Sequence, residues 1–301
     1  MKAVQLHGYG GVSQLRYEEV PTPTPGPQEV LVKVAATSVN PIDWKIRRGD
    51  LKEVMPLQFP VILGRDVAGE VVETGAKVSQ WKPGQKVMGL VNRSYAEFVS
   101  AAADAFAPIP EGLDMEQAAA LPLVTITGAQ LIQHVQPKRG DTVLVTGALG
   151  SVGRTAVYVA RQLGARVIAG VRAKQQQEAE SLGADQIVAI DDDREIESLP
   201  QLDAIADTVG HDVIGRLIPK LKRGGVLGSV LGKPQAAEGK DIRVEAFMAQ
   251  PDPARLRQLA EAVQGGAFNI PVARTFKLSE AAEAQTLSEQ GGVDGKIVLV
   301  S

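Results

Sequence analysis

The sequence predicts an α/β protein with two domains, one a β-rich, barrel-like domain and the other a doubly wound parallel sheet. The length of 301 residues exceeds that of a typical single domain. Short strand-like runs separated by Pro- and Gly-rich segments dominate the sequence up to about residue 120. From about Leu121 the pattern changes to a regular alternation of strands and helices, which is typical of a parallel sheet.

Composition excludes several classes of protein. A hydrophobic content of 44% is ordinary for a globular core, and the formal net charge of −3 gives no sign of a nucleic-acid partner. No apolar run is long enough to span a bilayer, and the start MKAVQLHGYGG lacks the apolar core of a signal peptide, so a cytoplasmic location without membrane contact is expected. Cysteine is absent, which removes disulfides, thiolate nucleophiles and cysteine-ligated metals.

Strands are expected throughout the β-rich half. Val30, Val32 and Val34 alternate with Leu31 and Lys33, as in a strand with two different faces. The expected strands span residues 29–39, 61–74, 86–91 and 95–100.

In the second half, the short apolar run TVLVT at Thr142–Thr146 is typical of a parallel strand that is covered on both faces. A helix should follow, because Val152, Ala156, Val159 and Leu163 recur at helical spacing. Further strands are expected at 166–171, 186–190, 203–209, 226–231 and 242–247, with helices at 173–182 and 212–221.

The end of the sequence again reads as a strand, at residues 295–300. We expect it to return to the β-rich domain, which makes the parallel-sheet domain an insertion. The predicted boundaries are therefore 1–121 with 268–301 for the first domain and 122–267 for the second.

A glycine-rich turn connects the first strand and helix of the second domain. Gly150 and Gly153 have the last two spacings of the dinucleotide-binding fingerprint, whereas the first glycine position holds Ala148, preceded by Gly147. Such a turn lets backbone N–H groups approach a pyrophosphate at a helix N-terminus. A loop without a ligand is the alternative, but the flanking strand and helix favour a nucleotide. The residues expected to contact it are Gly147, Gly150, Ser151, Val152 and Gly153.

The end of the second strand indicates which nucleotide binds. An NAD-selective site usually has an acidic residue there, whereas this sequence has Arg172, followed by Lys174. A guanidinium suits the additional 2′-phosphate of NADPH, so NADPH is the predicted cofactor. The alternative is that both side chains are solvated residues at the start of a helix.

Five segments carry a family resemblance that covers essentially the whole sequence. They are VNPIDWKIRRG at 39–49, GRDVAG at 64–69, AAALP at 118–122, DTVG at 207–210 and GKIVL at 295–299. In combination they resemble the zinc-independent quinone oxidoreductases and enone reductases of the medium-chain dehydrogenase/reductase superfamily. The resemblance implies a split GroES-like β-barrel catalytic domain, a Rossmann domain inserted near the C-terminus, a cofactor cleft between the two, and a homodimer.

No metal site is expected. The segment at 64–69 looks like the one that carries a catalytic-zinc histidine in alcohol dehydrogenases, but that position holds Arg65. His7, His134 and His211 are spread along the sequence without ligand spacing. We expect each of these histidines to be structural or superficial.

The resemblance also implies site residues. Asn40 matches an asparagine beside the nicotinamide and the acceptor, where its amide would donate to a developing oxyanion, and Thr127 matches a threonine that faces the nicotinamide. Lys45 matches a polar position at the wall of the cleft. Each of the three has a structural alternative. Asn40 could cap the backbone of a turn, Thr127 could bond the backbone of its own helix, and Lys45 could be solvated. Asp43 is expected to be a structural acceptor. The remaining expected cofactor contacts are Val209, Leu231 and Gly232.

Two positions depart from the family pattern. Ile190 stands where relatives that bind NADPH often have a tyrosine that stacks near the adenosine. Lys45 and Leu51 stand where some relatives have aromatic residues that line the quinone pocket. The predicted function is hydride transfer from NADPH to a small electron-poor acceptor, a quinone or an α,β-unsaturated carbonyl, without zinc. The alternatives are an enoyl-thioester reductase and a non-catalytic, crystallin-like or regulatory NADPH-binding protein.

Overall fold

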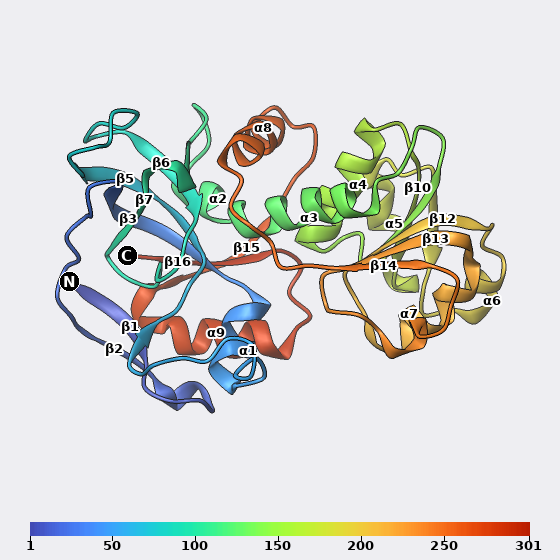
Figure 1. The fold of residues 1–301 in the computed structure, drawn as a ribbon, viewed down its shortest axis with the longest axis horizontal. Helices are drawn as coiled ribbons and strands as arrows, with labels where there is room; N and C mark the ends of the chain where they lie inside the picture. Colours follow the sequence, from blue (N-terminus) through green and yellow to red (C-terminus); the bar gives the residue numbers. More distant parts are fainter. The chain divides into compact units, whose positions relative to one another are not determined.

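The chain forms two compact units, which are described separately. The computed structural model describes residues 1–301 apart from the side chain of His211. The first unit comprises Met1–Leu123 and Pro251–Ser301, and the second comprises Val124–Gln250 (Figure 1). The first boundary lies within two residues of the expected one. The second lies earlier than the expected residue 267, because helix α8 (Pro253–Gln264) packs against strands of the first unit.

A seven-stranded sheet forms the centre of the first unit, in the order β15-β16-β3-β5-β6-β8 with β7 on β3. The eleven-residue β3 (Glu29–Val39) pairs with β7 in its first half and with β16 in its second half. Valines of these strands form a core of their own. The other strands of this sheet are β5 (Asp66–Thr74), β6 (Lys86–Leu90), β7 (Phe98–Ala102), β8 (Phe106–Pro108), β15 (Val272–Lys277) and β16 (Lys296–Val300).

A second, three-stranded sheet of this unit has the order β2-β1-β4, and two helices pack near it. Its strands are β1 (Lys2–Leu6), β2 (Leu15–Glu19) and β4 (Val61–Ile62). The helices of the unit are α1 (Pro41–Arg48), α2 (Met115–Ala119), α8 and α9 (Ala281–Gln290), with short 3-10 turns η1 (Val12–Gln14), η2 (Ala103–Ala105) and η7 (Leu278–Glu280). The contacts between α1 and α9 join the two sequence segments of the unit.

Two expectations for the first unit differ from the structure. The strand expected at 61–74 is two strands, because Gly64 between them has φ +96° and its missing Cβ would lie 2.5 Å from Ser94 Oγ. The strand expected at 95–100 begins later, at Phe98, because Tyr95 is fully buried and bonds to Leu63 and Asp43 instead. The expected return of the final strand is confirmed, since β16 pairs with β3.

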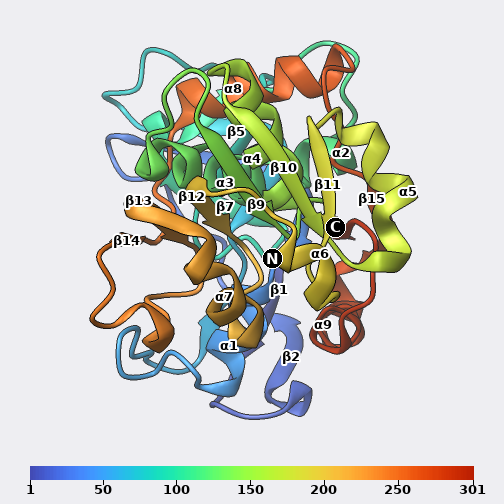
Figure 2. The same cartoon turned by 90° about the vertical axis from the view of Figure 1, so that its right-hand side faces the viewer.

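The second unit is a six-stranded sheet with every neighbouring pair parallel, in the order β11-β10-β9-β12-β13-β14 (Figure 2). The order reverses direction at β9 (Thr142–Thr146), which is the arrangement of a doubly wound dinucleotide-binding sheet. The other strands are β10 (Arg166–Val171), β11 (Gln186–Ala189), β12 (Leu202–Asp207), β13 (Leu221–Ser229) and β14 (Arg243–Ala246).

Helices cover both faces of this sheet, because right-handed crossovers in opposite directions place them on opposite sides. A buried cluster of aliphatic side chains joins the sheet to the segments at Ile196 and at Ile214–Ile218. On α3, Gly128 approaches the backbone of Val152 so closely that a Cβ would lie 2.6 Å from its carbonyl oxygen. The helices are α3 (Pro122–Val135), α4 (Ser151–Gln162), α5 (Gln176–Ala179), α6 (Asp193–Glu197) and α7 (His211–Leu217), with turns η3 (Ala173–Gln175), η4 (Glu180–Leu182), η5 (Ile218–Lys220) and η6 (Gln235–Ala237).

The burial of β16 leads to a stability prediction. Leu299 is fully buried in the core of the first unit, whereas its neighbour Val300 is partly exposed. Leu299→Ala should lower the free energy of unfolding by about 2–5 kcal/mol, because it removes apolar contacts and leaves a cavity. Urea titration followed by circular dichroism measures this change. Val300→Ala is the matched control, and equal losses for the two variants would contradict the central position of β16.

Candidate functional site

The glycine-rich turn lies between β9 and α4, at the carboxyl end of the sheet. Gly147 has φ +61°, and a Cβ there would lie 2.6 Å from Thr208 Oγ1. A Cβ on Gly153 would lie 2.2 Å from the carbonyl oxygen of Gly147, so the helix can approach the strand this closely only with glycine at this position. Gly150 is the N-cap residue of α4. Because glycine has no side chain, it does not cap the backbone N–H groups at the start of this helix. This turn provides a helix N-terminus on which an anion can bind.

A buried aspartate holds the ends of three neighbouring strands together at this edge. Asp207 Oδ1 accepts hydrogen bonds from Thr146 Oγ1 (2.8 Å) and from the backbone N–H groups of Val209 (3.1 Å) and Gly210 (2.9 Å). Its Oδ2 accepts from Ser229 Oγ at 3.0 Å. The loops after β9, β12 and β13 are therefore fixed relative to one another at the point where the strand order reverses.

The structure brings most of the expected cofactor contacts of this unit together at that edge. A Cβ on Gly147 would lie 2.9 Å from Val209 Cγ2, and one on Gly210 would lie 2.8 Å from Leu231 Cδ1. Leu231 is 44% exposed, and Gly232 beside it has φ +98°. The turn and the loops after β12 and β13 thus line the same end of the sheet.

Arg172 and Lys174 follow β10, the strand next to β9. Both side chains are exposed, and neither has a charged partner among the residues that the structure describes. The N–H of the intervening Ala173 donates to Asp191 Oδ1 at 2.8 Å, which fixes the backbone between them. Ile190, at the position where the resemblance implies a tyrosine, is buried in the aliphatic cluster and therefore offers no stacking surface.

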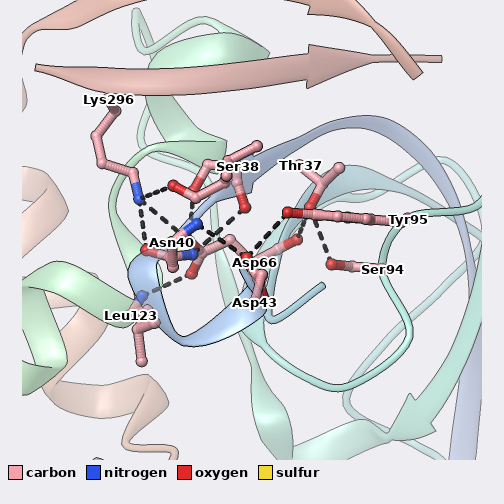
Figure 3. A network of polar contacts seen from close by, with 10 residues as sticks. Thr37, Ser38, Asn40, Asp43, Asp66, Ser94, Tyr95, Leu123 and Lys296 are labelled. Carbon is pink, nitrogen blue, oxygen red and sulfur yellow. Dashed lines mark hydrogen bonds and ion pairs between the residues drawn. The ribbon is translucent and has the colours of Figure 1, made fainter. Parts of the chain in front are cut away.

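In the first unit, Asn40 belongs to a buried polar network (Figure 3). Its Nδ2 donates to Asp66 Oδ2 at 2.7 Å and to the Ser38 carbonyl at 3.3 Å, and its Oδ1 accepts from Lys296 Nζ at 2.5 Å. Its backbone N–H donates to Asp43 Oδ2 at 2.8 Å. Donation from this amide to another oxygen would therefore require one of these bonds to break.

Asp66 is the centre of that network. Its Oδ2 also accepts from Ser38 Oγ at 2.5 Å, and its Oδ1 accepts from the backbone N–H of Leu123 at 2.7 Å. Lys296 Nζ lies 3.8 Å from Oδ2 and donates to the carbonyl of Val39 at 3.1 Å. Burial lowers the pKa of Lys296, an effect that the charge of Asp66 opposes.

Asp43 is a structural acceptor, as expected. It is fully buried and accepts hydrogen bonds from the Asn40 backbone and from Tyr95 Oη at 2.9 Å. Burial raises the pKa of Asp43 to about 6, although both hydrogen bonds act in the opposite direction. Burial also raises the pKa of Tyr95 well above its ordinary value.

The other expected catalytic residues lie on two helices. Lys45 is half-buried on α1, with Nζ 5.7 Å from the centroid of the Trp44 ring. Leu51 packs on the apolar core beside this helix. Thr127 is on α3 and is 9% exposed. The structure thus gives Lys45 an aromatic neighbour that the sequence reasoning had not considered.

Among the side chains that the structure describes, no group of three or more His, Asp or Glu residues has the geometry of a metal site. His7 Nε2 lies 2.6 Å from Glu18 Oε1, and His134 stacks on Phe247 with ring centroids 4.4 Å apart. The side chain of His211 lies outside the described part of the structure. None of the described helices is long and apolar enough to cross a membrane.

Comparison with known proteins agrees with this geometry. Residues 26–111 match the family "Alcohol dehydrogenase GroES-like domain", and residues 182–299 match "Zinc-binding dehydrogenase". A chloroplast envelope quinone oxidoreductase homolog of Arabidopsis thaliana is 30% identical over 99% of this chain and 98% of its own length. The chain belongs to the quinone oxidoreductase and enone reductase branch of the medium-chain dehydrogenase/reductase superfamily.

Two further comparisons support this family assignment. A solved structure, that of the quinone oxidoreductase from Coxiella burnetii, is 34% identical with a TM-score of 0.89, and the match covers 100% of this chain and 99% of that one. An NADPH-dependent alkenal/one oxidoreductase of Arabidopsis thaliana is 30% identical over 99% of this chain and 79% of that protein. The units described above are therefore the GroES-like domain and the Rossmann domain of a medium-chain oxidoreductase.

Sequence reasoning missed two residues that shape this oxidoreductase. Asp207 was noted only as part of a family segment, although a carboxylate directly after a buried strand could have indicated its role. Arg154, on α4, donates to the carbonyl of Leu149 (2.9 Å) and to Glu178 Oε1 (2.8 Å), and so braces the glycine-rich turn. No motif distinguished this arginine from a surface residue of an amphipathic helix.

The pKa of Asp43 predicts a pH dependence of stability. Because the folded-state pKa of about 6 exceeds the ordinary value of 3.8, the folded protein binds the proton more tightly than the unfolded chain. Stability from this group is therefore present at low pH and is lost as the pH rises through about 4 to 6.

Asp43→Asn removes this titration. The difference in unfolding free energy between the parent and this variant should fall by up to about 3 kcal/mol across that window and then level off. Urea titrations at half-unit pH intervals measure it, with the exposed Asp104→Asn as control. A difference that stays constant with pH would show that Asp43 titrates normally.

Proposed function

We propose that the protein is an NADPH-dependent, zinc-independent reductase of quinones or α,β-unsaturated carbonyl compounds. The observation that carries this proposal is the pairing of a glycine-rich turn at the N-terminus of α4 with an unneutralised Arg172 at the end of the next strand. The names of the relatives, a quinone oxidoreductase homolog and an NADPH-dependent alkenal/one oxidoreductase, support the same reaction class.

The residues at the carboxyl edge of the Rossmann sheet fit the cofactor. The missing side chains of Gly147 and Gly153 leave room for the tight turn, and the N-terminus of α4 is suited to a pyrophosphate. Gly150, Ser151 and Val152 would contribute backbone N–H groups. The exposed guanidinium of Arg172 and ammonium of Lys174 would hold the 2′-phosphate, which NADH lacks. The rest of the cofactor would contact Val209, Leu231 and Gly232.

NADPH, when bound, supplies the hydride for this reaction. The protein then has to bind and orient an electron-poor acceptor and to stabilise the negative charge that develops on its oxygen. We propose Lys45 and Thr127 as contacts to the reacting partners. Asn40, whose amide is fully engaged in the structure, would hold the start of α1 in place. The final proton would come from solvent.

Zinc is not required in this proposal, because the donor set for it is missing from the sequence. Cysteine is absent, and Arg65 occupies the position at which the resembling alcohol dehydrogenases carry a zinc histidine. Elemental analysis of active enzyme should therefore find no stoichiometric zinc.

A homodimer and a cytoplasmic location are further expectations for this protein. The edge strand β14 of the Rossmann sheet could pair with the same strand of a second copy to form the dimer.

The reaction is tested by following NADPH absorbance with 1,4-benzoquinone, but-3-en-2-one and a crotonyl thioester as acceptors. We expect consumption of NADPH with the quinone or the enone, and much slower consumption of NADH. Turnover of the thioester alone would indicate an enoyl-thioester reductase. Binding of NADPH without turnover of any acceptor would indicate a non-catalytic protein.

Cofactor selectivity is tested at Arg172. Arg172→Glu should weaken the affinity for NADPH about 10- to 100-fold, because it replaces a charge-assisted contact by repulsion, while the affinity for NADH changes little. Fluorescence titration measures both constants. Arg166→Glu is the matched control, since this exposed arginine begins the same strand at its opposite end. If both nucleotides lose affinity equally, Arg172 does not recognise the 2′-phosphate.

A further inference from the structure

One buried carboxylate bonds to the starts of two helices. Asp66 has no exposed surface, and its Oδ2 accepts from Nδ2 of Asn40, the N-cap residue of α1, at 2.7 Å (Figure 3). Its Oδ1 accepts from the backbone N–H of Leu123, in the first turn of α3, at 2.7 Å. These are the helices that carry Lys45 and Thr127, the two proposed contacts to the reacting partners.

The bond to Asn40 holds the N-terminal end of α1. Lys45 follows Asn40 by five residues, which is between one and two helical turns. Near the other end of the helix, the buried guanidinium of Arg47 donates to Oε1 of Gln285 on α9 at 2.8 Å. Lys45 lies between these two attachments, so the loss of the Asp66 bond should displace Lys45 without detaching the helix.

The bond to Leu123 holds the N-terminal end of α3. The first N–H groups of a helix have no partner within the helix, and here the carboxylate supplies one. Its negative charge also interacts favourably with the helix dipole at this end. Thr127 follows Leu123 by four residues, which is about one helical turn. Asp66 therefore fixes the start of the turn that leads to Thr127.

A carboxylate can make both bonds, and its isostere asparagine cannot. A carboxylate accepts at both oxygens, whereas a carboxamide accepts at one atom and donates at the other. Asn40 cannot compensate by turning its amide over, because its Oδ1 accepts from Lys296 Nζ, and an ammonium can only donate. Stability alone does not explain this group, since apolar side chains can often replace a buried ion pair without loss of stability.

We propose that Asp66 is a positioning residue, which fixes the starts of α1 and α3 and so places Lys45 and Thr127 for the reaction. This inference rests on the proposed function, in which these two side chains contact the reacting partners. Asp66 acts only through the two helices, because it is itself completely buried. A displacement of a positioning group by about 1 Å can lower a rate about 100-fold.

Amide hydrogen exchange tests the structural part of this inference without any turnover. Asp66→Asn keeps the size of the side chain but leaves a single acceptor oxygen, so at least one helix start loses its bond. Exchange should become about 10- to 100-fold faster in residues 41–49, in residues 122–130, or in both, as measured by mass spectrometry. Exchange in β6 should not change.

Steady-state kinetics test the functional part. In the NADPH assay with but-3-en-2-one, Asp66→Asn should lower kcat about 10- to 100-fold. The KM for the enone and the Kd for NADPH should stay within about threefold, because the groups that bind them are still present but are no longer aligned for the transition state.

Val71→Ala is the matched structural control. Val71 is also fully buried on β5, and the valine core to which it belongs contains no residue of α1 or α3. This variant should lower stability in a urea titration, because it leaves a cavity. Its kcat and its exchange at both helix starts should nevertheless stay within about twofold of the parent.

Asn40→Ala separates the two helices. It removes the link from Asp66 to α1 and keeps the bond to Leu123. Exchange should therefore accelerate in residues 41–49 and not in residues 122–130, and kcat should fall. If Asp66→Asn does not fold, Asn40→Ala and Val71→Ala decide the question by the same two measurements.

The outcomes distinguish this inference from the proposed function. Equal exchange and equal kcat in Asp66→Asn and Val71→Ala would overturn the role of Asp66. Faster exchange at the helix starts with an unchanged kcat would overturn it as well, because Asp66 would then hold the helices without placing the contacts. A parent protein that turns over no quinone or enone would refute the proposed function, whereas the exchange rates would still show whether Asp66 fixes the two helix starts.

Discussion

The buried carboxylate of Asp66 is the constraint on which the first domain depends. A charge with no exposed surface is tolerated only when it is paired and its lone pairs are filled. Here the partners come from distant parts of the sequence: Ser38 near the end of β3 and Asn40 directly after it, Leu123 at the start of α3, and Lys296 at the start of β16. The carboxylate therefore ties the N-terminal and C-terminal segments of this domain together at one point.

Asp207 is the corresponding buried carboxylate of the Rossmann domain, but its hydrogen-bond partners are of a different kind. It binds backbone and hydroxyl donors instead of a cation, and its partners are the ends of three adjacent strands. Such an arrangement fixes loops without placing a side-chain positive charge at the edge of the sheet. The free N-terminus of α4 and the exposed Arg172 then remain the groups there that attract a phosphate.

Much of this architecture could be predicted from the sequence, because it depends on local patterns. The alternating strands and helices, the turn at Gly147–Gly153 and the return of the final strand were all read correctly, and the fold and family are confirmed. The break at Gly64 and the boundary before α8 were not, because each depends on packing against residues far away in the sequence. The hydrogen bonds of the Asn40 amide could not be predicted from the sequence either. A family motif indicates which residue is present, whereas its hydrogen-bond partners, Asp66 and Lys296, come from other segments.

The position of β16 between β15 and β3 has a consequence for biosynthesis. The Rossmann domain is continuous in sequence, so it can complete its sheet while the ribosome is still translating the last part of the message. The other domain cannot, because the second half of β3, which pairs with β5 on one side, lacks its neighbour on the other side until residues 296–300 emerge. During that interval an apolar strand edge is open to pairing with other chains. The open edge is a direct consequence of the order of the segments, because β16 is synthesised only after the whole Rossmann domain.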